Sequence, residues 1–180
     1  MRLSLSILLS LLSTNLVVAA APSAAWFPQA PELPDPVGKI VRVSNVEELL
    51  KATASVKSGE TILVADGHYY LPRYVEIAAD NVTLRSASGK RDRVILDGQR
   101  SRHGELVGIT GCEGVTIADL TVQNVKWNGI KINSDRGAQR VTVRNCVLHN
   151  IWQRGVKAPG IRENADRLSP RDCRVEFCLF

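Results

Sequence analysis

The stretch VTIADLTVQNVKWNGIKI at residues 115–132 recurs as VTVRNCVLHNIWQRGVKA at residues 141–158, an offset of 26 residues without gaps. The polar and small residues that recur in step are Asn124 and Asn150, Gly129 and Gly155, and Lys131 and Lys157. A fixed period of this length is typical of repeat architectures, in which each unit buries its apolar side against the next unit. The chain is therefore expected to fold as a stack of similar units.

Within each unit the apolar residues alternate with polar ones, which predicts short β-strands and leaves no room for a helix. In the first copy, Val115, Ile117, Val122, Ile130 and Ile132 fall on three such strands. Three short strands in one period describe one coil of a parallel β-helix, whose strands pair with their counterparts one coil later, about 4.8 Å away. The sequence thus predicts an all-β solenoid in which Ile130 lies against Val156.

This pattern resembles the right-handed parallel β-helix proteins of the pectate-lyase-like superfamily, and the likeness covers roughly residues 59–180. The resemblance implies a right-handed parallel β-helix, here of about four coils. It also implies a substrate groove along one strand face.

The first 20 residues read as a secretory signal peptide, with one Arg, an apolar run and small residues at the end. The alternative is a membrane anchor, but Ser, Thr and Asn residues dilute the apolar run below what a stable span needs. We therefore expect a secreted or periplasmic protein with no membrane span after cleavage. Residues 21–43 include several prolines and are expected to form an extended lead-in, followed by one β-helix domain over residues 44–180.

A capping box of Ser44 and Glu47 predicts a short helix from about Val46 to Ala54, which would cover the first coil. At the other end, Phe180 falls at an inward strand position and no closing segment follows it. An uncapped apolar edge is an aggregation hazard. We expect either that this chain is a truncated piece of a longer β-helix, or that its C-terminal coil associates end to end with another subunit.

Residues 85–180 carry 17 of the 23 Lys and Arg but only 10 of the 18 Asp and Glu. A basic half on an exported protein favours an anionic partner, and outside the cytoplasm an acidic polysaccharide is a more natural partner than nucleic acid. The alternative is a basic surface that serves only solubility.

The four cysteines are Cys112, Cys146, Cys173 and Cys178, and their spacing matches no metal site. By the repeat, Cys178 lies one coil beyond Cys146, within reach of a disulfide in an oxidising compartment. Buried free thiols are the other interpretation, and the one we prefer.

Asp119 and Asn145 occupy equivalent corners of successive coils, and Asn124 and Asn150 occupy the next turn. Asn and Asp are common turn residues, so we interpret all four as structural. In the resembled family this corner carries a stacked Asn ladder.

The strand face that contains Lys131 and Lys157 is the candidate functional site. Its predicted outward column is Glu76, Gly108, Lys131 and Lys157. Two ammonium groups on adjacent coils repel each other. A bound anion such as a uronate carboxylate would offset this repulsion, and a neutral lysine would act as a base; alternatively, both side chains extend into water.

Aromatic and charged side chains in the flanking turns suit a sugar groove, because a sugar ring packs on an aromatic ring while its acid group meets a cation. The candidates for substrate binding are Arg154, Arg136, His103, Trp127 and Asp135, with Trp152 beside them. At least one of Trp127 and Trp152 is expected to fill the core under its turn, because the two are out of register by one position.

The resemblance implies β-elimination of a uronate polysaccharide, with Lys131 and Lys157 as the catalytic candidates. It also implies Ca²⁺ as a cofactor, although no acidic cluster for a metal and no other cofactor motif is evident. A non-catalytic module that binds glycan or acts as a surface spacer is the alternative, because one solenoid serves many functions.

Overall fold

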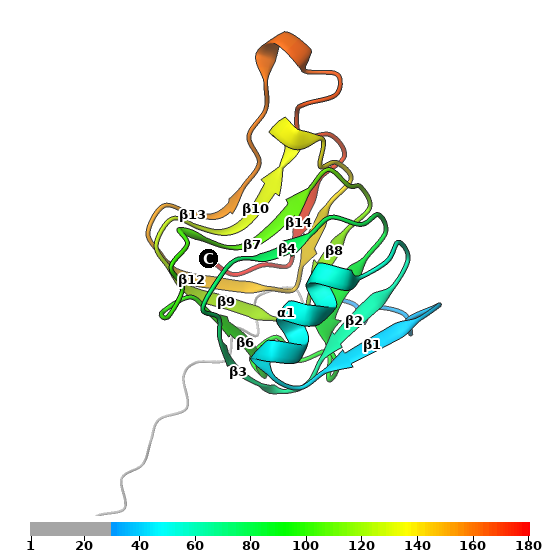
Figure 1. Cartoon of the computed structure of the whole chain (residues 1–180), viewed down its shortest axis with the longest axis vertical. Helices are drawn as coiled ribbons and strands as arrows, with labels where there is room; N and C mark the ends of the chain where they lie inside the picture. Colours follow the sequence, from blue (N-terminus) through cyan, green and yellow to red (C-terminus); the bar gives the residue numbers. More distant parts are fainter. Residues whose placement is uncertain (1–29) are drawn as a thin grey trace, which may run out of the picture.

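The computed structural model describes residues 30–180, so the expected signal peptide (1–20) and residues 21–29 of the expected lead-in lie outside the described residues. The described part contains three all-parallel β-sheets and one α-helix (Figure 1), an arrangement compatible with an all-β solenoid. None of the helices in it is long and apolar enough to cross a membrane.

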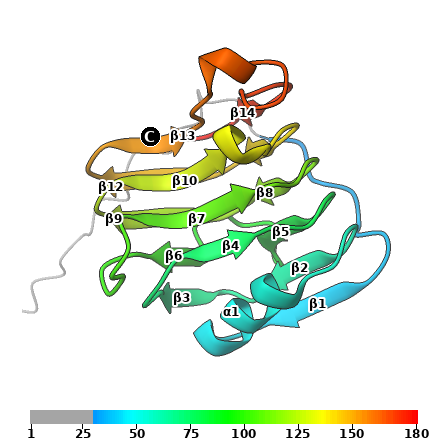
Figure 2. The same cartoon turned by 45° about the horizontal axis from the view of Figure 1, so that its top comes forward.

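The chain visits the three sheets in turn, so each sheet collects strands that are far apart in sequence (Figure 2). Sheet A contains β1 (Ile40–Val43), β2 (Thr61–Val64), β5 (Thr83–Ser86), β8 (Thr116–Ala118), β11 (Thr142–Arg144) and β14 (Arg174–Glu176). Sheet B contains β3 (Gly67–Tyr70), β6 (Val94–Asp97), β9 (Thr121–Val125) and β12 (Val147–Ile151). Sheet C contains β4 (Val75–Ile77), β7 (Glu105–Thr110), β10 (Asn128–Asn133) and β13 (Arg154–Lys157).

The core consists of apolar columns in which one residue from each strand lies over the next. In sheet C, Val107 pairs with Ile130, and Ile130 pairs with Val156, which confirms the predicted 26-residue stacking. Ile130 is fully buried, as is Val122 between Leu96 and Leu148 in sheet B. Removing these side chains from water is the main driving force for the stack, at roughly 25 cal/mol for each Å² of apolar surface.

Helix α1 (Val46–Ser55) packs against β4, β1 and β2 and buries Leu49. Its cap differs from the predicted pair of Ser44 and Glu47. Asn45 is the N-cap and accepts a hydrogen bond from Glu48 N at 2.9 Å, while the Glu48 carboxylate accepts one from Ser44 N at 2.8 Å. Asn45 and Glu48 keep the i, i+3 spacing of the motif one residue later, but the Glu48 carboxylate accepts from the residue before the N-cap and not from the N-cap itself.

Two of the strands, β1 and β3, are not marked by the alternating pattern from which strands were predicted. β1 lies within the expected extended lead-in and pairs with β2 along its whole length. β3 has the sequence GHYY, which begins with a glycine and shows no clear alternation. Both are strands because a parallel neighbour supplies their hydrogen bonds, which local sequence does not reveal.

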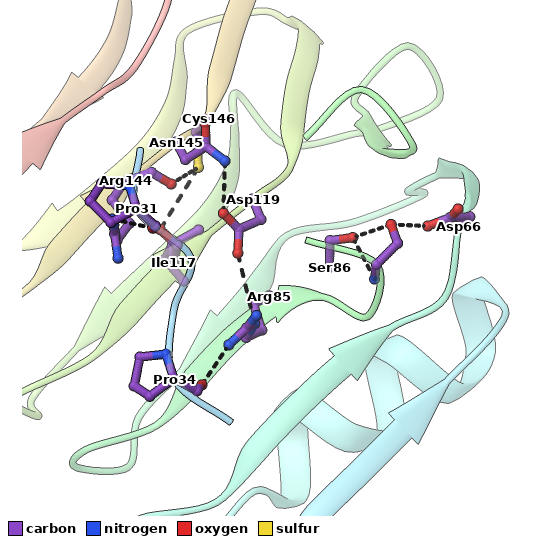
Figure 3. Close-up of polar contacts among 11 residues, drawn as sticks. Pro31, Pro34, Asp66, Arg85, Ser86, Ile117, Asp119, Arg144, Asn145 and Cys146 are labelled. Atoms are coloured by element: carbon purple, nitrogen blue, oxygen red, sulfur yellow. Dashed lines mark hydrogen bonds and ion pairs between the residues drawn. The ribbon is translucent and has the colours of Figure 1, made fainter. Parts of the chain in front are cut away.

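The four polar residues predicted at turns all have left-handed backbone. Asp119 and Asn145 lie at bends between strands, as predicted, whereas Asn124 and Asn150 lie within β9 and β12 and not in turns. Asp119 and Asn145 have φ values of 58° and 48°, and Asn145 Nδ2 donates a hydrogen bond to Asp119 Oδ1 at 2.8 Å (Figure 3). Asn124 and Asn150 have φ values of 56° and 51° and are joined in the same way. Short polar side chains tolerate this conformation better than other residues with a Cβ, which explains their recurrence.

A proline-rich segment, residues 30–36, runs over the outer face of sheet A (Figure 3). Arg85 donates a hydrogen bond to Pro34 O at 3.0 Å, and Arg144 donates one to Pro31 O at 2.9 Å. The backbone carbonyls of a segment without regular structure thus find partners on the sheet.

All four cysteines are free thiols in the structure; Cys112 and Cys146 are buried, as preferred from the sequence, whereas Cys173 and Cys178 are only half-buried. Cys146 and Cys178 are neighbours on successive coils, because Val147 and Leu179 pair directly after them. Burial raises the pKa of Cys146 well above its usual value, whereas a hydrogen bond with Cys146 lowers the pKa of Cys178 to about 7. The two thiols therefore differ in reactivity although they touch.

Candidate functional site

The outer face of sheet C carries the predicted column. Glu76 pairs with Gly108, Gly108 with Lys131, and Lys131 with Lys157. Each pair lies on adjacent parallel strands, whose spacing is about 4.8 Å. The structure therefore brings Lys131 and Lys157 together as the sequence predicted.

Lys131 has a counter-charge that the sequence prediction missed. Its Nζ lies 3.4 Å from Glu105 Oε1, and each side chain is 22% exposed. The same carboxylate oxygen accepts a hydrogen bond from Asn128 Nδ2 at 3.3 Å. This ion pair partly offsets the repulsion between the two ammonium groups without a bound anion.

Lys157 and Arg154 form the unpaired basic end of the face. Among the described residues, Lys157 forms no side-chain ion pair or hydrogen bond. Arg154 is exposed, pairs with Asn128 through the backbone register, and donates only to its neighbour Gln153 at 3.3 Å. These two cations are therefore available to an anionic ligand.

Tyr74 covers the middle of the column. A side chain at Gly108 would collide with the Tyr74 ring, so the absence of a Cβ there makes room for the phenol. The Tyr74 hydroxyl accepts a hydrogen bond from Asn133 Nδ2 at 3.2 Å. Burial raises the pKa of Tyr74, with nearby Glu76 and Glu105 adding to the effect, so the phenol stays protonated at neutral pH.

His103 lies at the other end of the column from Lys157. It is exposed, and its ring centroid is 6.3 Å from that of Tyr74. With Arg73 and Glu76 it lines a hollow of about 410 Å³ beside helix α1. His103 thus lies at the Glu76 end of the column, away from Lys157 and Arg154.

Asp135 and Arg136 follow β10 directly in a short 3₁₀ helix, Ser134–Arg136. Arg154 begins β13, beside the first residue of β10, so it lies at the opposite edge of the face from Arg136. Arg136 is exposed, and one carboxylate oxygen of Asp135 is buried without a hydrogen-bond partner among the described residues. Asp135 and Arg136 therefore flank the lysines at the end of the strands, whereas Arg154 lies at the start of the strands.

Neither of the two described tryptophans fills the core, which corrects the prediction that at least one does. Trp127 is 44% exposed and Trp152 is 84% exposed. The Trp127 ring packs on the outside of Gly104, where a Cβ would come within 2.0 Å of it. A glycine on the neighbouring turn therefore gives this ring a place outside the core.

The described residues do not fit a calcium site. Nowhere between residues 30 and 180 do three or more His, Cys, Asp or Glu side chains gather in a way that could hold a metal ion. Calcium is bound by several oxygen ligands, usually including carboxylates.

The face as a whole is bipolar, with Glu76, Glu105 and the Tyr74 phenol toward one end and Lys157 and Arg154 at the other. Two signals in the sequence could have revealed the missed residues. Glu105 is an acidic residue three positions before the outward Gly108, and a glycine in the outward column leaves room for a neighbouring ring. The chain matches no protein-family model, no curated protein and no solved structure.

Proposed function

We propose that this chain is an exported, right-handed parallel β-helix protein of the polysaccharide-lyase-like kind, which binds an acidic, uronate-containing polysaccharide along the outer face of sheet C. About four coils and a cap formed by α1 complete the proposed architecture. All-parallel pairing in three sheets supports it, as does the position of α1 against β1, β2 and β4 (Figure 2).

The observation that carries the binding proposal is the stacking of Lys131 on Lys157 beside Arg154, with Glu105 the one carboxylate paired to this group among the described residues. Cations on successive strands form a row along the stack, and a polyuronate presents its carboxylates in a row. Guanidinium and ammonium groups bind carboxylates through charge-assisted hydrogen bonds. Lys157 and Arg154 would bind first, because neither has to leave a counter-ion.

Cleavage by β-elimination would use the same face. A lysine would remove the proton at C5 while a neighbouring cation neutralises the uronate carboxylate. The electron pair would form the C4–C5 double bond, and the C4–oxygen bond would break. Tyr74, whose phenol is protonated, lies over the Cα partner of Lys131 and would give its proton to the leaving oxygen.

The Lys131–Glu105 ion pair favours the second candidate function, a glycan-binding module without catalysis. One of the two candidate bases is already engaged by a carboxylate at 3.4 Å. A module of this kind needs only the row of cations and the open face.

The test is to incubate the protein with alginate, pectate and glycosaminoglycans and to record both ultraviolet absorbance of an unsaturated product and retention on the immobilised polymers. The variant Lys131→Ala/Lys157→Ala should lose salt-dependent retention, because each cation contributes to neutralising the polymer. A matched control is Lys51→Ala/Lys90→Ala, which removes the same charge at two exposed positions outside the strands of sheet C. Equal retention of both variants would rule out the binding site, and absence of absorbance with retained binding would favour the module.

A further inference from the structure

A second groove lies at the corner where sheet B leads into sheet C. We name it the corner groove, and it has a volume of about 820 Å³. Three successive coils line it where the strands of sheet B end, with residues Gly98, Gln99 and Ser101, then Asn124, Val125 and Lys126, then Asn150, Ile151 and Trp152. Because Val125 pairs with Ile151, the side chains of Lys126 and Trp152 start from adjacent positions in the stack. The volume is in the range of pockets that hold small organic ligands.

Trp152 presents a bare aromatic ring to this groove. Trp152 is 84% exposed, second to Val37 among the described large apolar residues, and no ring or cation from residues 30–180 packs on its faces. Trp127, by contrast, lies against Gly104 and has Lys126 Nζ at 5.7 Å from its ring centroid. No described ring or cation packs on the Trp152 ring, so this ring is free to contact a ligand.

The amides beside Trp152 are held in one orientation by a buried carboxylate. Asp97 is fully buried and accepts hydrogen bonds from Asn124 Nδ2 at 2.8 Å and Gln123 Nε2 at 2.7 Å. With its amino group committed to Asp97, Asn124 turns its oxygen toward the next turn, where it accepts a hydrogen bond from Asn150 Nδ2. Asn150 Oδ1 is then left as an acceptor with no partner among the described residues.

We propose that the corner groove is a saccharide-binding site, in which the Trp152 indole stacks on the apolar face of a pyranose ring and Asn150 Oδ1 accepts a hydrogen bond from a sugar hydroxyl. A pyranose combines a flat C–H face with hydroxyl donors around its rim, which matches an exposed ring beside a preoriented carbonyl oxygen. Neither contact needs a charge on the sugar. The site therefore extends to neutral saccharides and does not rest on the acidic polymer proposed for sheet C.

The experiment uses the full chain labelled with ¹⁵N-tryptophan and a panel of neutral cello-, manno- and galacto-oligosaccharides together with oligouronates. The Nε1–H signal of Trp152, assigned by its loss in Trp152→Phe, should shift saturably with at least one neutral saccharide. Trp152→Ala should weaken binding about tenfold, whereas Trp152→Phe should stay within about threefold because a ring is kept. Asn150→Ala should also weaken binding, and Val37→Ala, another exposed apolar residue, should have no effect.

The outcomes separate this site from the sheet C face. Lys131→Ala/Lys157→Ala should bind neutral saccharides as tightly as the parent. No shift of the Trp152 signal with any saccharide, or equal affinity of Trp152→Ala and the parent, would overturn the proposal. A shift that occurs only with oligouronates and disappears in the lysine variant would overturn it as well, because the groove would then be an extension of the basic face.

Discussion

The hydroxyl oxygen of Tyr74 lies where the side chain of residue 108 would be, since a Cβ built on Gly108 would come within 1.5 Å of it. This contact joins β4 to β7 across the outer face of sheet C and sets the shape of the middle of the candidate site. Gly108 has an ordinary negative φ, so the need for glycine here is steric and not conformational.

Gly108→Ala should therefore destabilise the protein by about 1–3 kcal/mol, the usual cost of overpacking. Urea unfolding measures this change. In a Tyr74→Ala background, Gly108→Ala should cost much less stability than in the parent, because the ring that the new methyl group would strike is gone. The same cost of Gly108→Ala with and without Tyr74 would disprove the steric relation.

Asp97 should make the free energy of unfolding depend on pH in the acidic range. Burial alone would raise its pKa, but hydrogen bonds from Gln123, Gln99, His68 and Asn124 together lower it. A carboxyl whose folded pKa is lowered contributes stability above its unfolded pKa of about 3.9, and that stability is lost as the pH falls through the folded pKa. Asp97→Asn should cost about 2 kcal/mol at neutral pH, and less in acid.

The measurement is the free energy of unfolding of both proteins at pH 7 and at pH 3. Asp92→Asn is the matched control, because Asp92 is exposed and its side chain has no partner among the described residues. A constant difference between parent and Asp97→Asn at both pH values would contradict the assignment of a lowered pKa.

Cys178 should be the cysteine that reacts first with an alkylating reagent near neutral pH. A hydrogen bond with Cys146 and the charge of Arg91 lower its pKa to about 7, whereas burial raises the pKa of Cys112 to about 11. The thiolate is the nucleophile, so labelling of Cys178 should rise through about pH 7. Peptide mass spectrometry after iodoacetamide treatment checks this order, and Cys146→Ala should shift the Cys178 midpoint upward. Labelling of Cys178 and Cys112 with the same pH midpoint would refute it.

Glu105→Gln should strengthen binding of an acidic polymer, if the function proposed for sheet C is right. The change releases Lys131 from its counter-ion at 3.4 Å and keeps a side chain of similar shape near Asn128. A partly exposed ion pair is worth about 0.2–1 kcal/mol, so the gain should be at most about fivefold in low salt and smaller in high salt. Glu113→Gln, which breaks the pair with Arg140 outside sheet C, is the control. Weaker binding of Glu105→Gln would show that the carboxylate serves the ligand directly.

The register of sheet C agrees with the sequence repeat. The repeat placed Lys131 beside Lys157 and Ile130 beside Val156, and both pairs are observed. It placed Gly108 beside Lys131 but did not identify Glu105 as the ion-pair partner of Lys131, because the register fixes neighbouring backbone positions and not how far a side chain reaches along the strand. Trp152 was expected near the site, but whether it faced the core or solvent was not readable from its position.

The sequence by itself determined the parallel stacking, the structural role of Asp119, Asn124, Asn145 and Asn150, and the lysine pair, because a repeat with a period-2 pattern buries its apolar face in one register only. Only the tertiary structure decided which charges and rings meet across coils of unequal length: Glu105 with Lys131, Tyr74 over Gly108, and Trp127 on Gly104. Such contacts join residues more than 20 positions apart through side chains. Which side chains meet depends on the geometry of the turns, and the alternation of polar and apolar residues does not encode that geometry.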